Sequence, residues 1–254
     1  MVGVVGFGAA ASASAETPLE GIWSFEGGKV AIVEQPDGSF DGIVVSPTKF
    51  ALCVHEVGET MWTGLTEQAD GSFWGMHRWF FDTGKCQANP DLGPTAWRLL
   101  EGESGDHYLK VCFSEPGSDE QPMIAADGEV ADVTYGCFDS AHIGPLPDSK
   151  VSSFAVLPAS SGCVSRNRMR IRVHDRVNDP LRRVRITLTS TNFRRAVKVN
   201  RRGASFVGTA DLTELPPESS FTVIIKLRTV LGKKLSAKRT YNRCTLKSPR
   251  SIRR

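Results

Sequence analysis

The chain has 254 residues, 23% of them charged, and a formal net charge of +3. That near-neutral total conceals two halves of opposite charge: residues 1–150 hold 7 Lys/Arg against 23 Asp/Glu, and residues 151–254 hold 24 Lys/Arg against 5 Asp/Glu. No apolar stretch reaches the roughly 18–20 residues that a membrane-spanning helix needs. The asymmetry predicts two separately folded units, an acidic one followed by a basic one.

The first fifteen residues have the composition of an export signal. Met1 to Ala10 is apolar and uncharged, and Ala13-Ser14-Ala15 follows before Glu16. An apolar core followed by an Ala-x-Ala site is typical of a secretory signal peptide, although the usual positive n-region is missing. Residues 1–15 therefore predict a signal peptide, truncated at its start, with a floppy Ala/Ser/Gly leader as the alternative. The protein is expected to be secreted, and to be extracellular or associated with the cell wall.

Six cysteines follow the expected cleavage site, and an even number in an exported chain predicts disulfides. None of them forms a Cys-x-x-Cys pair, which argues against zinc. One predicted bond, between Cys163 and Cys244, encloses nearly the whole basic half. The other four cysteines allow three pairings. We favour Cys53–Cys86 and Cys112–Cys137, because each bond would join neighbouring hairpins.

Four candidate hairpins occupy the acidic half, and three of their turns contain Asp-Gly. Asp-Gly between β-prone runs is a strong hairpin signal, since Gly takes positive φ at little cost. The paired runs are 29–33 with 40–45, 60–65 with 72–81, 95–100 with 108–113, and 122–125 with 130–136. Eight sequential antiparallel strands predict an up-and-down β-barrel over residues 16–144. An open meander and a sandwich are the alternatives.

The Gly21-Ile22-Trp23 segment, just before the first expected strand, resembles the Gly-x-Trp signature of lipocalin-like barrels. The repeated Asp-Gly-aromatic hairpins are also similar to those of small exported lipocalin-like barrels. The resemblance covers about residues 20–140 of the chain. It implies that Trp23 closes one end of the barrel and that a late arginine, here Arg98, packs across its ring.

An eight-stranded barrel either encloses one small ligand or is filled by its own side chains. Phe73, His77 and Trp79 share one face of an expected strand. With Trp62 they are the candidate binding residues for a small apolar ligand. The alternatives are that these aromatic residues fill the core, or that some of them form an exposed patch.

The segment 145–162 is rich in Pro and Ser at the point where the charge changes sign, which indicates a linker. Beyond it, apolar and basic residues alternate along 166–173, 183–188 and 221–228. Such period-two patterning over several strands predicts a two-sheet sandwich over 163–246, and therefore an all-β protein. Residues 247–254 are expected to form a disordered basic tail.

The segments 211–223 and 231–244 resemble the end of bacterial Ig-like modules, and this second resemblance covers about residues 160–246. It implies an accessory or adhesive module, because Ig-like folds carry many functions. The arginines of the outward positions form a candidate face for an anionic polymer of the cell envelope: Arg166, Arg168, Arg170, Arg172, Arg183 and Arg185. A solvated positive surface and a contact with the acidic barrel are the alternatives. No nucleic-acid motif accompanies this face, so a nucleic-acid partner is not expected.

No catalytic constellation stands out in the chain. The five His residues form neither His-x-x-x-His nor His-Glu-x-x-His, and no nucleophile elbow or phosphate-binding loop occurs. We therefore expect no metal, no cofactor and no catalytic residues. The sequence favours an exported, non-enzymatic protein that binds a small ligand or a cell-envelope component. The alternative is a secreted hydrolase that uses a pair of barrel carboxylates.

Overall fold

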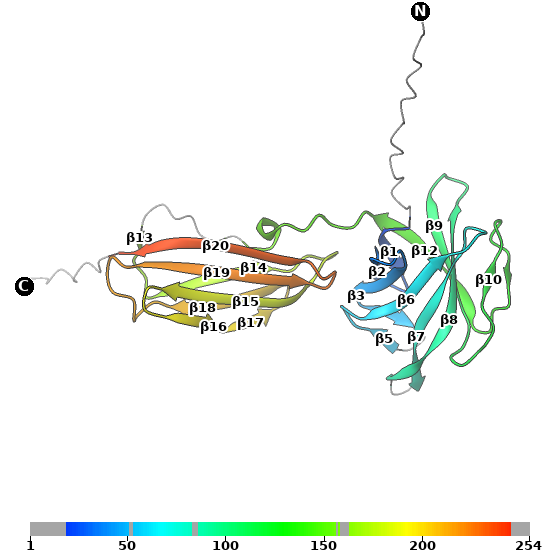
Figure 1. Cartoon of the computed structure of the whole chain (residues 1–254), viewed down its shortest axis with the longest axis horizontal. Coiled ribbons are helices and arrows are strands. Elements are labelled where there is room, and N and C mark those ends of the chain that lie inside the picture. The colour runs from blue at the N-terminus through cyan, green and yellow to red at the C-terminus, as the bar shows by residue number, and fades with distance from the viewer. Residues whose placement is uncertain (1–18, 51–52, 83–85, 156, 158–162, 245–254) are drawn as a thin grey trace, which may run out of the picture.

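A computed structural model describes residues 19–50, 53–82, 86–155, 157 and 163–244. The predicted signal peptide and basic tail lie outside these ranges. Figure 1 shows two β units that follow one another along the chain. No helix within the described ranges is long and apolar enough to cross a membrane.

The first unit is a closed antiparallel barrel of eight strands. Its strands, in spatial order, are β1 (Gly21–Phe25), β12 (Gly136–Gly144), β9 (His107–Phe113), β8 (Gln87–Glu101), β7 (Phe73–Asp82), β6 (Thr60–Glu67), β3 (Phe40–Ser46) and β2 (Gly28–Glu34). Pairing of β1 with β12 closes the barrel. The expected barrel is therefore confirmed, and Gly71 (φ +79°) and Gly128 (φ +88°) make the Asp-Gly turns possible.

Two of the eight barrel strands differ from the sequence-based expectation. Gly21–Phe25, expected to precede the first strand, is itself the first strand, and Gly136–Gly144 is the last. The run 122–125 instead supplies β10 (Met123–Ile124), which pairs with β11 (Val130–Ala131) in a separate two-stranded sheet. This short hairpin lies outside the barrel wall, because Ile124 and Val130 pack against Ala96 and the Cys112–Cys137 pair. A second short hairpin consists of β4 (Thr48–Phe50) and β5 (Cys53–His55).

The barrel core is dominated by aromatic rings. Trp23, Trp62 and Trp97 are fully buried, and the rings of Trp62 and Trp97 meet edge to face with centroids 4.5 Å apart. Gly42 leaves the space that Trp62 needs, since a Cβ there would lie 2.4 Å from its ring. Interdigitated rings of this kind give a barrel its unique packing.

The second unit contains two sheets around one apolar core. The five-stranded sheet has the order β13 (Cys163–Val164), β20 (Lys234–Arg243), β19 (Ser220–Thr229), β15 (Leu181–Ser190) and β16 (Arg194–Val197). The three-stranded sheet has the order β14 (Arg168–His174), β18 (Ser205–Asp211) and β17 (Val199–Arg202). Phe154, which follows the short 3-10 helix η1 (Val151–Ser153), is also buried in this core. Part of the predicted linker thus packs with the second unit.

All three predicted disulfides are present: Cys53–Cys86, Cys112–Cys137 and Cys163–Cys244. The second bond joins residues that are directly opposite on β9 and β12. The third joins β13 to the residue that follows β20, so it closes the basic unit at the ends of its chain. Bonds of this type persist in oxidising compartments.

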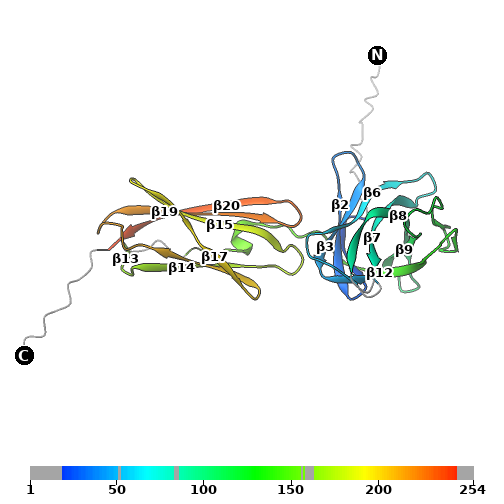
Figure 2. The ribbon, with the colours of Figure 1, turned by 90° about the horizontal axis from the view of Figure 1, so that it is seen from below.

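The two units meet at the β19–β20 turn, as Figure 2 shows from below. Val230, in this turn, is 9% exposed and packs with Ile22, Ala31 and Val45 on the outside of the barrel. Lys29 of the barrel also donates a hydrogen bond of 3.3 Å to the side chain of Asn178. The acidic and basic units are therefore in direct contact.

Candidate functional site

The barrel interior holds all four predicted ligand-binding residues. Trp62 and His77 are fully buried, while Phe73 and Trp79 are 6% and 7% exposed. The His77 ring lies 5.6 Å from that of Trp79, and His77 is the cross-strand partner of Trp62. Phe73 packs against Phe40, at 5.8 Å. The structure thus brings Trp62, His77 and Trp79 together with many aromatic neighbours.

Several nitrogen atoms in this interior have no hydrogen-bond partner among the residues that the structure describes. They are Nε1 of Trp62, Trp79 and Trp97, both ring nitrogens of His77, and Nε2 of His55. Burial, reinforced by the neighbouring His55, holds the pKa of His77 well below its ordinary value of 6.5. His77 is therefore neutral, and its two nitrogens lie in an aromatic environment. An unpaired buried polar group lowers the stability of the folded state by about 1–3 kcal/mol. These nitrogens therefore destabilise the barrel core.

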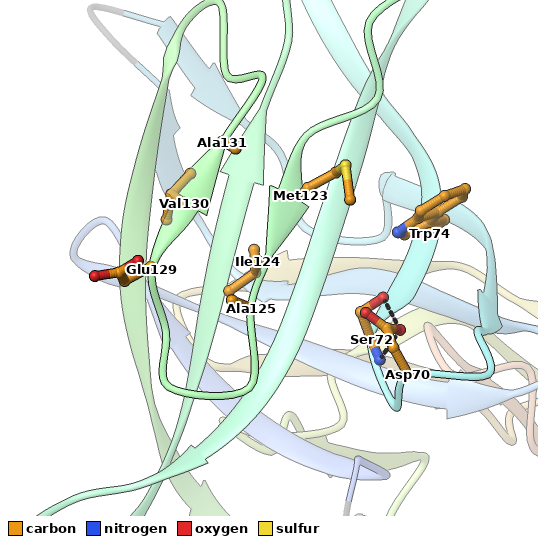
Figure 3. Close-up of a pocket in the computed structure, with 9 residues that line it drawn as sticks. All are labelled: Asp70, Ser72, Trp74, Met123, Ile124, Ala125, Glu129, Val130 and Ala131. Carbon is orange, nitrogen blue, oxygen red and sulfur yellow. Dashed lines mark hydrogen bonds between the residues drawn. The ribbon is translucent and has the colours of Figure 1, made fainter.

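A groove of about 220 Å³ lies on the outside of the barrel, between β7 and the β10–β11 hairpin. Figure 3 shows Trp74 and Met123 on facing sides of it. These side chains are 36% and 50% exposed, and Ile124 and Val130 continue the apolar lining. Asp70 and Ser72 line it beside Trp74, and Glu129 lines it on the hairpin. The strand patterns in the sequence do not predict this groove, because it joins segments about fifty residues apart.

A buried arginine, Arg98, holds the groove in shape. Its Nε donates to the carbonyl oxygen of Ile124 at 2.7 Å, and its Nη1 and Nη2 donate to the backbone oxygen and carboxylate of Asp70 at 2.9 and 2.7 Å. Arg98 is only 7% exposed. Hydrogen bonds from Ser72, together with the Arg98 guanidinium, lower the pKa of Asp70. One guanidinium thereby fastens the β10–β11 hairpin to the β6–β7 turn.

This role of Arg98 corrects the partner that the lipocalin resemblance implied. Trp97 points into the barrel core, so its neighbour Arg98 points out of the barrel. Trp23 lies inside, where its Nε1 donates to the Leu19 carbonyl at 2.9 Å and its ring lies 4.8 Å from that of His142. The barrel wall therefore separates Arg98 from Trp23.

The six arginines of the predicted anionic-polymer face lie on two different sheets. Arg168, Arg170 and Arg172 are exposed on β14 of the three-stranded sheet, and Arg166 is exposed just before it. Arg183 and Arg185 are exposed on β15 of the five-stranded sheet. Because the two sheets enclose a common core, their outer surfaces face opposite ways. The structure therefore divides the predicted face into two.

The outer surface of the five-stranded sheet has the denser charge. Arg183 lies opposite Arg228, which lies opposite Lys234, and Arg185 lies opposite Lys226. Lys238 adds a further cation, opposite Ile224. We call these six exposed residues the basic face: Arg183, Arg185, Lys226, Arg228, Lys234 and Lys238. Like charges directly across a sheet repel one another. With respect to the described residues, none of the six side chains has an ion pair or hydrogen bond.

The arginines of β14 lie opposite residues that carry no positive charge. Arg168 lies opposite Asp211, Arg170 opposite Thr209, and Arg172 opposite Val207. The hydrogen bonds of Thr213, with a contribution from the positive charge of Arg168, lower the pKa of Asp211. Alternation along one strand identified these arginines, but the cross-strand partners that distinguish the two faces depend on tertiary pairing.

A buried general acid has a raised pKa, and the carboxyl groups of this protein show the opposite shift. Each described carboxyl with a displaced pKa is lowered, first of all by hydrogen bonds from neighbouring donors in Asp37, Asp70, Asp148 and Asp211. In Glu59, burial acts to raise the pKa, and the hydrogen bond and charge of His55 outweigh it.

Across the described ranges, no three His, Cys, Asp or Glu side chains are grouped as a metal site would require. No protein-family model matches the chain, and no curated protein is found to be similar to it.

Proposed function

We propose that the protein is an exported, non-enzymatic binding protein whose basic face attaches it to an anionic polymer of the cell envelope. The observation that supports this most is the cross-strand arrangement of Arg183, Arg228 and Lys234, with Arg185 and Lys226 in the next row. A fold gains nothing in stability by placing cations opposite one another, so a binding partner is the simplest reason to retain them.

The geometry of the basic face suits a polymer better than a single small anion. Neighbouring strands lie about 4.8 Å apart, and alternate residues along a strand about 6.6 Å apart. The face is therefore an array of closely spaced charges on the outer surface of a sheet. A chain with repeated negative charges meets several cations at once, and the contributions of these contacts accumulate.

The covalent structure favours a location outside the cytoplasm. Three disulfides use all six cysteines. The apolar Met1 to Ala10 segment and the resemblances to exported barrels and Ig-like modules support secretion. In this proposal the Ig-like unit is the attachment module and the lipocalin-like barrel is the unit that it displays.

The test compares two triple charge reversals in the full-length protein. R185E/K226E/R228E changes the basic face, and R168E/R170E/R172E changes the opposite sheet by the same net charge. Both sets are exposed, so the apolar core is untouched. Binding to a purified glycerol-phosphate teichoic acid and to polygalacturonate is measured at low and at physiological salt.

We expect the first variant to bind about tenfold or more weakly, because each exposed ion pair is worth about 0.2–1 kcal/mol and three are replaced by repulsion. The second variant should retain most of the affinity. Binding should weaken with salt, since charges are screened beyond about 8 Å at physiological ionic strength. Equal losses in both variants, or no binding of either polymer at low salt, would contradict the proposal.

A small-ligand function is the second candidate, and the unpaired nitrogens of Trp62, His77 and Trp79 favour it. A guest with hydrogen-bonding groups would relieve their desolvation. Native mass spectrometry of the protein purified from its own source should then show a stoichiometric adduct. The adduct should be weakened in W79F, which removes one of these donors while keeping an aromatic ring. An unliganded mass in every preparation would count against this second function.

A further inference from the structure

The groove beside Trp74 belongs to neither the basic face nor the barrel interior. It leaves Trp74 and Met123 open to solvent on facing sides, although other tryptophans of the barrel are at most 7% exposed. An exposed aromatic and an exposed thioether in one concave surface are characteristic of binding sites. Its volume of about 220 Å³ suits one side chain or a small group rather than a whole domain.

The groove is held open by contacts on both sides. The β7 side is fixed by the buried guanidinium of Arg98 through Asp70, and the hairpin side by the same guanidinium through Ile124. Ile124 is 2% exposed and packs onto the layer that contains the Cys112–Cys137 disulfide. A preformed site binds with little loss of conformational entropy.

The charge around the groove selects against anions. The segment 115–132, which contains the hairpin, holds six Asp/Glu and no Lys/Arg. The Asp70 side chain is 57% exposed and accepts a hydrogen bond from Arg98, whose side chain is 8% exposed. The other nearby cation, Lys110, donates to the carbonyl oxygen of Gly128, so both cations already have partners within the protein. A cation would therefore be attracted by the rim and would meet the electron-rich face of Trp74.

We infer that this groove binds a cationic side chain of a basic peptide or protein segment, that is, an arginine or lysine with its aliphatic stem. The stem lies between Trp74 and Met123, and the cationic group stays at the acidic rim of the groove, which includes Asp70 and Glu129. Long basic side chains combine an apolar stem with a charged head, which matches an apolar groove with an acidic rim.

The test uses the full-length protein and the indole N–H signals of its five tryptophans in ¹H–¹⁵N NMR spectra. The W74F variant assigns the Trp74 signal. Three acetylated, amidated pentapeptides serve as probes: Gly-Gly-Arg-Gly-Gly, the same peptide with Glu, and the same peptide with norleucine. The arginine peptide should shift the Trp74 signal in a saturable way, and the Glu and norleucine peptides should not.

A pair of double variants tests the role of the acidic rim. E120Q/E129Q removes two charges from the groove segment, and E26Q/E34Q removes two charges beside β2, on the opposite side of the barrel order. We expect E120Q/E129Q to weaken arginine-peptide binding about two- to fivefold, and E26Q/E34Q to weaken it less. Unchanged signals from the four buried tryptophans will show that each variant remains folded.

Three results would overturn the inference. Equal binding of the norleucine peptide would show that the groove takes a neutral apolar group. A Trp74 signal that changes with protein concentration alone would assign the groove to a second copy of the chain. No shift with any peptide at millimolar concentration would show that it is not a binding site. None of these results depends on the basic face, so the proposed function is tested separately.

Discussion

His77 is a fully buried, titratable side chain in the aromatic core of the barrel. Its ring lies 4.5 Å from the rings of both Phe50 and Phe113, and within the described part of the chain neither of its nitrogens has a hydrogen-bond partner. Because burial depresses its pKa, folding releases the proton that the unfolded chain would hold at mildly acidic pH. The adjacent His55 makes a hydrogen bond of 3.0 Å to Glu59 through Nδ1, and its Nε2, like the His77 nitrogens, has no hydrogen-bond partner among the described residues.

This residue predicts acid sensitivity. The unfolded chain binds a proton at His77 below about pH 6.5 and the folded chain does not, so the free energy of unfolding should fall by up to about 1.4 kcal/mol per pH unit below 6.5. In H77L that part of the pH dependence should disappear. Urea unfolding between pH 7.5 and 5 measures it. The exposed His107 provides a control, and H107Q should keep the parent profile. An H77L variant with the same pH dependence as the parent would assign the effect to another group.

At the scale of elements, the β10–β11 hairpin shows how one side chain can position a short segment. Two residues per strand cannot form a stable sheet alone. The hairpin is stable because its residues Ile124 and Val130 pack against the barrel and because Arg98 donates a hydrogen bond to its backbone. Lys110 adds a bond of 3.1 Å to the carbonyl oxygen of Gly128.

Replacing Arg98 by methionine keeps an unbranched apolar stem and removes three hydrogen bonds. We expect R98M to lower the free energy of unfolding by about 1–3 kcal/mol, since the buried carbonyl of Ile124 is left unpaired. Amide hydrogen exchange should accelerate at Ala125 and Gly128, whose N–H groups bond within the hairpin. R78M is the matched control, because the Arg78 side chain is 42% exposed and, among the described residues, donates to the carbonyl oxygen of Thr60 and lies 3.6 Å from the carboxylate of Glu59, away from the hairpin. Equal effects of R98M and R78M would show that Arg98 does not hold the hairpin.

At the scale of the whole molecule, two units of opposite charge are joined through a small apolar contact at Val230. Such a contact between domains is modest in size, so the alignment of the units depends on few residues. This matters for the proposed attachment, because the alignment decides how close the acidic barrel lies to the polymer that the basic face binds.

A charge in this contact should release the units from one another. V230D buries a carboxylate against Ile22, Ala31 and Val45, so we expect a larger radius of gyration by small-angle X-ray scattering, with each unit still folded. V133D is the control, because Val133 is 37% exposed and lies in the segment between β11 and β12. Parent-like scattering from V230D would show that other contacts align the units.

The sequence by itself determined the all-β class and the disulfides, which depend on local chemistry and cysteine spacing. Asp-Gly turns and period-two alternation predicted all-β structure, and the number and spacing of cysteines predicted three disulfides that the structure contains. Only the tertiary structure decided which runs enter the barrel: the 122–125 run pairs in a separate hairpin, and Gly21–Phe25 and Gly136–Gly144 close the barrel instead. It also decided that Arg98 bonds Asp70 rather than Trp23, and that the predicted arginines occupy two opposite sheets. Local propensity sets the conformation of a segment, but strand pairing and side-chain partners come from contacts between distant residues, which no single-strand pattern encodes.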